Sequence, residues 1–205
     1  MSLLRKTPGK SLRILHVGNH TLPCVGGIEN VIWQTSREQA RRGHSVSILV
    51  FNRCTSGAIL PAQEEKEGII IHRVPQVGFS FYRMPPVRAY LDALKNVDIV
   101  HVHGINAWMD WAWVLKPFHR ARIVVNTHGG FFHTQERKLL KAFYFHTILP
   151  LAKRGVDLFL IDSASDAQNL GMEAHSKYVL LPNGLDLGEL SRLPFAGRKK
   201  GYFLY

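Results

Sequence analysis

The sequence predicts an α/β fold, a Rossmann-like parallel sheet with helices on both of its faces. Short apolar segments rich in strand-forming residues alternate along the chain with amphipathic segments, the order that parallel strands and crossover helices require. Glycines and polar clusters follow most of the apolar segments, at the strand ends where such sheets bind ligands. The 205 residues, of which 46% are hydrophobic, suffice for one core of this kind.

The apolar segments are interpreted as strands because of their length and their content of β-branched residues. They cover residues 12–18, 45–51, 68–74, 98–104, 122–130, 156–162 and 178–184. The segment AQEEKEG (62–68), which precedes the third of them, is expected to be a charged loop.

Helices are expected between these strands. The predicted ranges are 28–43, 86–96, 107–119, 134–155 and a short helix within 163–171. The first places Ile28, Val31 and Ile32 at helical spacing and ends at Gly43. Pro150 should bend or divide the helix 134–155, because proline cannot donate the backbone hydrogen bond of a helix interior.

The chain is expected to comprise three parts. Residues 1–10 are interpreted as a disordered leader, 11–190 as the Rossmann-like domain, and 191–205 as an interdomain linker with the start of a truncated second domain. The ending RKKGYFLY is a basic turn followed by the opening of an apolar strand. No signal peptide or membrane-spanning run is recognised, so a cytoplasmic location is expected, with Cys24 and Cys54 as reduced thiols.

The chain carries a formal net charge of +11, with 26 lysines and arginines against 15 acidic residues. Such an excess indicates an anionic partner: nucleic acid, acidic lipid or a phosphorylated substrate. Nucleic acid is not expected, because the basic residues are scattered and no zinc-finger, helix-turn-helix or RNP-like pattern is present. A basic segment with aromatic neighbours suggests a membrane-surface patch, although a solvated basic face would look the same; it contains Phe131, Phe132, Arg137, Lys138 and Lys141.

The segment VGNHTLPCVGGIEN (17–30) joins the first strand to the first helix. A dinucleotide fingerprint is excluded, because the glycines lie too far from the strand and the second strand ends FNRC, without an acidic residue. A P-loop is excluded because no Gly-Lys-Ser/Thr is present. Gly26 and Gly27 at a helix start still suit an anion, through free N–H groups and the helix dipole. The alternative, that they only allow a tight turn, stays open.

Two histidines close successive strands of the predicted sheet, and each is followed by glycine. His103 closes DIVHVHG and His128 closes VVNTHGG, so both are candidates to donate hydrogen bonds to a sugar or a phosphate. His101 lies inside its strand and is interpreted as a core residue. No cysteine or carboxylate joins these histidines at a metal-ligand spacing, so no metal site is expected.

Four motifs in this order, GGIEN, DIVHVHG, VVNTHGGFF and LPNGLD, resemble the N-terminal half of GT-B retaining glycosyltransferases of the family 4 or group 1 type. The resemblance implies two Rossmann-like domains that face each other across a cleft. The N-terminal domain would bind the acceptor and the C-terminal domain most of the nucleotide sugar. The implied reaction transfers a hexose of the mannose or glucose type from a nucleotide-diphosphate sugar to a glycan or lipid-linked acceptor, with retention and without a cofactor.

The resemblance also implies roles for individual residues. His103 is the implied catalytic residue, in contact with the transferred sugar, and Gly26 and Gly27 approach the donor diphosphate. Glu29 is expected to support the helix start. The residues implied on the acceptor side or in the cleft are His128, Gly129, Asn106, Asn183 and Asp186.

The family's pair of glutamates, which belongs to the C-terminal domain, has no counterpart in this sequence. The chain is therefore expected to be an isolated N-terminal domain that lacks turnover alone. A lipid-pyrophosphate oligosaccharide would suit its positive charge as acceptor, with peripheral contact at the anionic inner membrane face. An epimerase of the same architecture is the alternative enzyme, but it would need catalytic carboxylates in the cleft, and none is convincingly placed.

Overall fold

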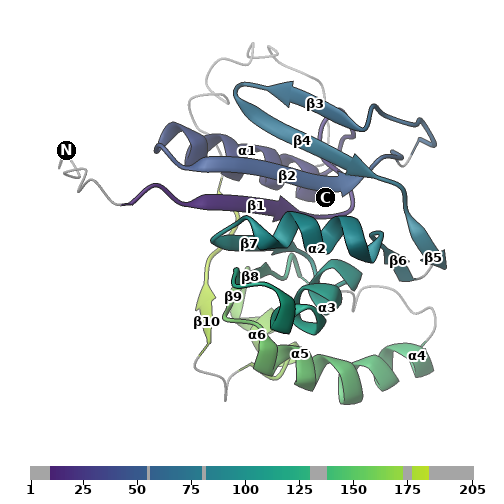
Figure 1. Cartoon of the computed structure of the whole chain (residues 1–205). Coiled ribbons are helices and arrows are strands. Elements are labelled where there is room, and N and C mark those ends of the chain that lie inside the picture. Colours follow the sequence, from purple (N-terminus) through teal and green to yellow (C-terminus); the bar gives the residue numbers. More distant parts are fainter. Residues whose placement is uncertain (1–9, 55, 80–81, 130–137, 173–176, 185–205) are drawn as a thin grey trace, which may run out of the picture.

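A single large sheet organises the part of the chain that the computed structural model describes, residues 10–54, 56–79, 82–129, 138–172 and 177–184. It has eight strands in the order β10-β9-β8-β7-β1-β2-β4-β3. Neighbouring strands from β10 to β4 are parallel, whereas β3 runs antiparallel to β4. In Figure 1 the strands extend from β3 at the top to β10 at the lower left. The predicted fold class is confirmed.

The strands agree with the predicted apolar segments but are shorter at several ends. Their bounds are β1 (Arg13–Val17), β2 (Ser45–Phe51), β3 (Gln63–Lys66), β4 (Ile69–Val74), β7 (Ile99–His103), β8 (Arg122–Asn126), β9 (Leu158–Ile161) and β10 (Tyr178–Leu180). A separate hairpin, β5 (Val77–Phe79) and β6 (Tyr82–Met84), was not predicted.

Alternation along the strands divides the core into two layers, because successive residues of a strand point to opposite faces. Ile14 of β1 packs with Ile32 and Trp33 of helix α1 (Gly27–Arg41). Leu15 and Val17 belong to the cluster on the other face. The helices that contribute to that second cluster are α2 (Val87–Lys95), α3 (Ala107–Val114), α5 (Leu149–Gly155) and α6 (Ala164–Asn169). Helices therefore cover both faces, as predicted.

The long helix predicted over 134–155 is not divided at Pro150 in its described part, but its regular hydrogen bonding is interrupted just before this residue. Its described part consists of α4 (Lys138–Phe143), a π-helical turn (Tyr144–Ile148) and α5, which has Pro150 in its first turn. The N–H of Leu149 bonds to the carbonyl of Tyr144, five residues earlier, and Pro150, which has no N–H, follows directly in a widened turn of the helix. The helix predicted over 107–119 ends earlier, as α3 followed by a 3-10 turn (Lys116–Phe118).

Residues 62–68 do not form the predicted charged loop, because most of them belong to strand β3. Glu67 and Gly68 have φ angles of 50° and 75°, the left-handed conformations of a tight hairpin turn, and fold β3 back onto β4. The strand is exposed along its whole length and carries charged side chains, as edge strands often do. A strand without a buried face shows no apolar alternation, so its sequence resembled a loop.

The two predicted end regions contribute almost nothing to this description. Apart from Lys10, the leader (1–10) and the linker (191–205) lie outside the described residues. None of the described helices combines the length and the apolar composition that crossing a membrane requires.

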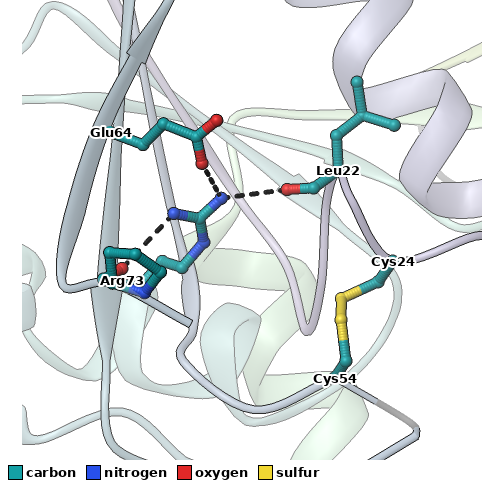
Figure 2. The surroundings of a disulfide bond; sticks show 6 residues. Leu22, Cys24, Cys54, Glu64 and Arg73 are labelled. Atoms are coloured by element: carbon teal, nitrogen blue, oxygen red, sulfur yellow. Dashed lines mark hydrogen bonds and ion pairs between the residues drawn. A yellow bond between two sulfur atoms is a disulfide. The ribbon is translucent and has the colours of Figure 1, made fainter. Parts of the chain in front are cut away.

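A disulfide between Cys24 and Cys54 fastens the glycine loop to the segment that follows β2 (Figure 2). The expectation of two reduced thiols is therefore wrong for this structure. The reason lies in the topology, because β1 and β2 are adjacent and parallel and the loops after them leave the same edge of the sheet. The two Cα atoms come within 5.7 Å, although 30 positions separate them in the sequence.

Arg73 of β4 holds the same loop from a second side (Figure 2). Its buried guanidinium donates to the carbonyl of Leu22 at 3.0 Å and to that of Pro61 at 3.3 Å. It also forms an ion pair with Glu64 at 2.7 Å. Because this charge is removed from water, such partners are needed to offset its desolvation. One covalent and one charged contact thus anchor the loop that leads to α1.

Reduction of the Cys24–Cys54 disulfide should lower the stability of the chain. A crosslink across a separation of 30 residues removes conformational entropy from the unfolded state, so its loss should cost about 3 kcal/mol of unfolding free energy. The measurement is urea unfolding with and without dithiothreitol. The Cys24→Ser/Cys54→Ser double variant should match the reduced protein and ignore the reductant. If dithiothreitol left the wild-type transition unchanged, the disulfide would be contradicted.

Candidate functional site

A pocket of about 240 Å³ lies at the carboxyl ends of β1, β7 and β8, beside the starts of α1 and α3. This is the edge at which parallel sheets place their ligand sites. Four predicted site residues line it: Glu29, His103, Asn106 and His128. The other lining residues are Asn19, His20, Ile28, Gly104, Ile105 and Thr127.

Three histidines form a continuous hydrogen-bonded chain beside this pocket. Nδ1 of His16, on β1, is 2.9 Å from Nε2 of His103, on β7. Nδ1 of His103 is in turn 3.0 Å from Nε2 of His128, which follows β8. The other nitrogen of His16, Nε2, is 2.7 Å from Oε1 of Gln39 on α1. The chain therefore runs from a helix, across two strands, to the wall of the pocket.

Burial keeps these histidines neutral. It lowers the pKa of His16 to about 4, and it lowers the pKa of His101 and of His103 well below the ordinary histidine value. Burial also lowers the pKa of His128 to about 4. At neutral pH each ring therefore has one N–H and one lone pair, as a chain of alternating donors and acceptors requires.

His101 is buried, as predicted for a core residue, but it is not fully satisfied. Its ring stacks on that of His103 with the centroids 4.4 Å apart. Its Nε2 has no hydrogen-bond partner among the described residues. His103 itself is 2% exposed, and both of its ring nitrogens bond to other histidines. It can therefore act on a ligand only by exchanging one of these bonds, or through His128.

His128 has a left-handed backbone, with a φ angle of 47°, that residues other than glycine rarely adopt. Gly129 follows with a φ angle of 74°, so the chain turns sharply after β8. The side-chain oxygen of Asn126 accepts a hydrogen bond from the backbone N–H of His128 at 3.3 Å. Nδ1 of His128 lies 3.9 Å from Oδ2 of Asp162, beyond hydrogen-bond reach.

The start of α1 carries the two glycines that the sequence singled out. The carboxylate of Glu29 lies against Gly26, where a Cβ would require only that this flexible side chain move aside. A Cβ on Gly27 would meet no atom within 4 Å, so the space beside it is open. In the described part of the chain, no side chain caps the first N–H groups of α1. The first N–H groups of α1 thus remain available to an anion.

The two predicted asparagines have structural partners. Asn106 is the N-cap of α3, where its Oδ1 accepts from the N–H of Trp108 at 3.0 Å. Its Nδ2 donates to the carbonyl of His103 at 3.0 Å, so the amide is engaged at both ends. Asn183 donates to Oδ2 of Asp162 at 3.1 Å, which draws the PNG segment toward the end of β9.

The predicted membrane patch is described only in part. The predicted residues outside the described ranges are Phe131, Phe132, Arg137 and Asp186. Lys138 and Lys141 lie on α4. The same helix exposes 89% of Leu139 and 59% of Phe143. Apolar and basic residues thus share this short helix.

Sequence reasoning missed His16, Gln39 and Asp162. His16 lies in the apolar run RILHVG, and its place beside His101 depends on the pairing of β1 with β7. The available signal was the spacing of His101 and His103, which puts both on one face of their strand. That spacing indicates a polar site on one face of the sheet, but it does not identify the residues of other elements that contact these histidines.

The cluster of His16, His101 and His103 could also be considered as a site for a metal ion. The ligand atoms of His16, His101 and His103 all lie within 4.8 Å of one another. Two of these atoms already share a hydrogen bond, so an ion would have to break the histidine chain in order to bind. The expected absence of a metal site stays a prediction.

Comparison with known proteins decides the family. The sequence profile described as Glycosyltransferase Family 4 matches residues 25–189, which include Gly26 and Gly27 as well as His103 and His128. The chain belongs to glycosyltransferase family 4. Two relatives are named GDP-mannose:cellobiosyl-diphosphopolyprenol alpha-mannosyltransferase. That of Xanthomonas oryzae is 30% identical, over 86% of this chain and 47% of its own length. That of Xanthomonas campestris is 31% identical, over 94% and 52%.

This family 4 chain therefore spans about half the length of the curated relatives that it matches. Among solved structures, the catalytic domain of starch synthase IV from Arabidopsis thaliana matches with a TM-score of 0.59 and 15% identity, over 87% of this chain and 53% of that one. The trehalose 6-phosphate synthase of Burkholderia multivorans matches with a TM-score of 0.51 and 15% identity, over 80% and 42%. These neighbours are GT-B glycosyltransferases, which confirms the predicted fold and the resemblance.

Acid should destabilise this family 4 chain through its buried histidines. Unfolded His16 takes up a proton near pH 6.5, whereas folded His16 resists protonation down to about pH 4, so the unfolded state binds more protons between these values. The stability due to His16 is fully present above pH 6.5 and is lost as the pH falls toward 4, by about 3 kcal/mol at most.

Urea unfolding across this pH range measures the effect. His16→Gln should show a flatter dependence of unfolding free energy on pH than the wild type. Asp110, whose pKa burial raises to about 6, acts in the opposite sense in both proteins, so its contribution cancels in the comparison. Equal slopes for the two proteins would contradict the assignment.

Proposed function

We propose that this chain is the N-terminal, acceptor-binding domain of a retaining hexosyltransferase. The reaction moves a sugar of the mannose or glucose type from a nucleotide-diphosphate sugar to a glycan or lipid-linked acceptor. The observation that carries the proposal is the pocket, which joins an uncapped helix start to the polar ends of parallel strands. The names of the Xanthomonas relatives favour GDP-mannose as donor and a diphosphopolyprenol-linked saccharide as acceptor.

The donor diphosphate is proposed to approach the start of α1. The N–H groups there lack a side-chain cap, and the open space beside Gly27 allows close contact with the backbone. Such fixed donors stabilise the charge that develops on a leaving diphosphate, without a cofactor. The carboxylate of Glu29 lies against the same helix start, so it must turn away from Gly26 when the diphosphate binds.

His103 is the proposed catalytic residue, and His128 its partner at the pocket wall. To contact the transferred sugar, His103 exchanges its bond to His128 for one to a sugar hydroxyl and keeps its bond to His16. Because the ring is buried, the new hydrogen bond is stronger than it would be in water. The residues proposed for the acceptor side or the cleft are His128, Gly129, Asn106, Asn183 and Asp186.

A second Rossmann-like domain is proposed to supply most of the donor site. The chain spans about half the length of its relatives, and on this proposal it binds the acceptor but does not turn over alone. The reaction would take place in the cytoplasm, at the inner face of a membrane, where the charge of +11 favours a phosphate-bearing acceptor.

The protein that contains this chain together with its second domain should transfer labelled mannose from GDP-mannose to a diphosphopolyprenol-linked oligosaccharide. His103→Ala should lower kcat by about tenfold or more, the equivalent of one hydrogen bond lost in the transition state. His72→Ala removes an exposed histidine of β4 and should keep the wild-type rate. No transfer from any nucleotide sugar would contradict the function, whereas an unchanged His103→Ala rate would contradict only the site.

The membrane patch of Phe131, Phe132, Arg137, Lys138 and Lys141 is proposed to contact anionic lipid. The support is α4, where the exposed apolar side chains of Leu139 and Phe143 flank Lys141. Apolar side chains next to basic ones are the combination that binds the surface of an anionic bilayer.

Charge reversal at Arg137, Lys138 and Lys141 should weaken binding to anionic vesicles at low salt, by at least tenfold, because each basic residue near the surface contributes about 1 kcal/mol. Vesicle co-sedimentation measures this binding. The matched control reverses three exposed arginines elsewhere, Arg41, Arg88 and Arg120. If the two triple variants bound the vesicles equally, net charge alone would explain the loss of binding, and the proposed membrane patch would be contradicted.

A further inference from the structure

The hydrogen-bonded chain beside the pocket begins at the amide of Gln39. Oε1 of Gln39 is 2.7 Å from Nε2 of His16, and contacts of 2.9 and 3.0 Å continue through His103 to His128. His16 and His103 are buried, and the side chain of His128 is only 5% exposed. Water therefore has little access to the contacts between the histidines, and the protons along the chain depend on its two ends, of which Gln39 is half-buried.

A carbonyl oxygen accepts hydrogen bonds but cannot donate them, and this decides the tautomers of the rings. Facing Oε1 of Gln39, His16 must carry its proton on Nε2 and its lone pair on Nδ1. His103 then carries its proton on Nε2, to donate to Nδ1 of His16. His128 likewise carries its proton on Nε2, to donate to Nδ1 of His103. Every donor in the chain thus points toward Gln39.

The reversed chain, in which Gln39 would offer its NH2 group to His16, is less favourable. It would place the proton of His128 on Nδ1, facing Oδ2 of Asp162. That oxygen is 3.9 Å away, too far for a hydrogen bond. Among the described residues, the reversed chain would therefore leave a donor without a partner at this end, whereas the chain that donates toward Gln39 leaves only a lone pair there.

We propose that Gln39 is a positioning residue, which sets the tautomer of His103 through His16 and so presents a lone pair at Nδ1 of His128. Gln39 does not line the pocket, so it acts only through the chain. Oδ2 of Asp162, 3.9 Å away, already accepts from Asn183, so the lone pair at Nδ1 of His128 is the acceptor that a donor such as a sugar hydroxyl would use. The tautomers do not depend on the proposed function, whereas the sugar hydroxyl as ligand rests on it.

Histidine 15N NMR on the 205-residue chain tests the proposal, because protonated and lone-pair ring nitrogens resonate at well-separated frequencies. The wild type should show His16, His103 and His128 each as a single Nε2–H tautomer. Gln39→Leu removes the acceptor and should shift these ring nitrogens toward mixed tautomers. Gln39→Glu, whose carboxylate can only accept, should keep the wild-type pattern. Gln168→Leu, the same substitution at an exposed position of α6, is the matched control and should also keep it.

Two results would overturn the proposal. One is an Nδ1–H tautomer of His103 in the wild type, which decides the matter even if Gln39→Leu fails to fold. The other is a folded Gln39→Leu protein whose histidine spectrum equals that of the wild type.

Kinetics of the two-domain protein test the role in transfer separately. Gln39→Leu should lower kcat by about tenfold with little change in KM, and Gln39→Glu should restore it. Mixed tautomers with an unchanged kcat would overturn the role of Gln39 in transfer. A wild type that shows the expected tautomers but transfers no sugar would contradict the proposed function and leave the tautomer assignment supported.

Discussion

The parallel pairing of β1 with β7 is the contact on which the candidate site depends. It sets His16 beside His101, which brings His16 within 2.9 Å of His103, and it ends both strands at the pocket. A slip of one residue would turn His16 to the face where Leu15 and Val17 now pack, and its nitrogens would lose their partners. The burial of those two apolar side chains therefore holds the register that the histidines need.

On the face of the sheet covered by α1, apolar side chains and buried histidines lie in the same layer. Beneath α1, strands β2 and β4 contribute Ile48 and Ile71, whereas on β7 the same layer contains His101 and His103. Buried imidazoles are tolerated when their nitrogens are paired, and Gln39 completes the pairing on the α1 side. The Nε2 of His101, which has no hydrogen-bond partner among the described residues, lowers the stability of the fold, and nothing in the structure explains it. Departures from the best apolar packing are expected where a protein binds its ligands.

The glycine loop owes its position to the strands around it. The disulfide ties it to the segment after β2, and Arg73 of β4 holds its Leu22 carbonyl. Both contacts come from strands on the same side of β1, so the start of α1 is supported from one flank and open to the pocket on the other. A rigid scaffold that holds a ligand-facing loop in this way is the usual arrangement in parallel α/β proteins.

By itself, the sequence determined the fold class, most strands, the irregularity of the helix near Pro150 and the edge of the sheet where the candidate site lies. These features follow from alternation, proline geometry and the rule that parallel strands end together, all of which act within a few residues. His103, His128, Asn106 and Glu29 could be placed in one pocket for that reason. Strand β3 could not be predicted, because an exposed edge strand has no apolar period.

The tertiary structure alone decided the pairing of Cys24 with Cys54, the contact of Arg73 with the glycine loop and the chain from Gln39 through His16 to His128. Each joins segments that are distant in the sequence, and each depends on which strands are neighbours. Local sequence patterns indicate that a segment is a strand and predict which of its faces is buried. They do not state the order of strands in the sheet, because that order results from the packing of the whole chain.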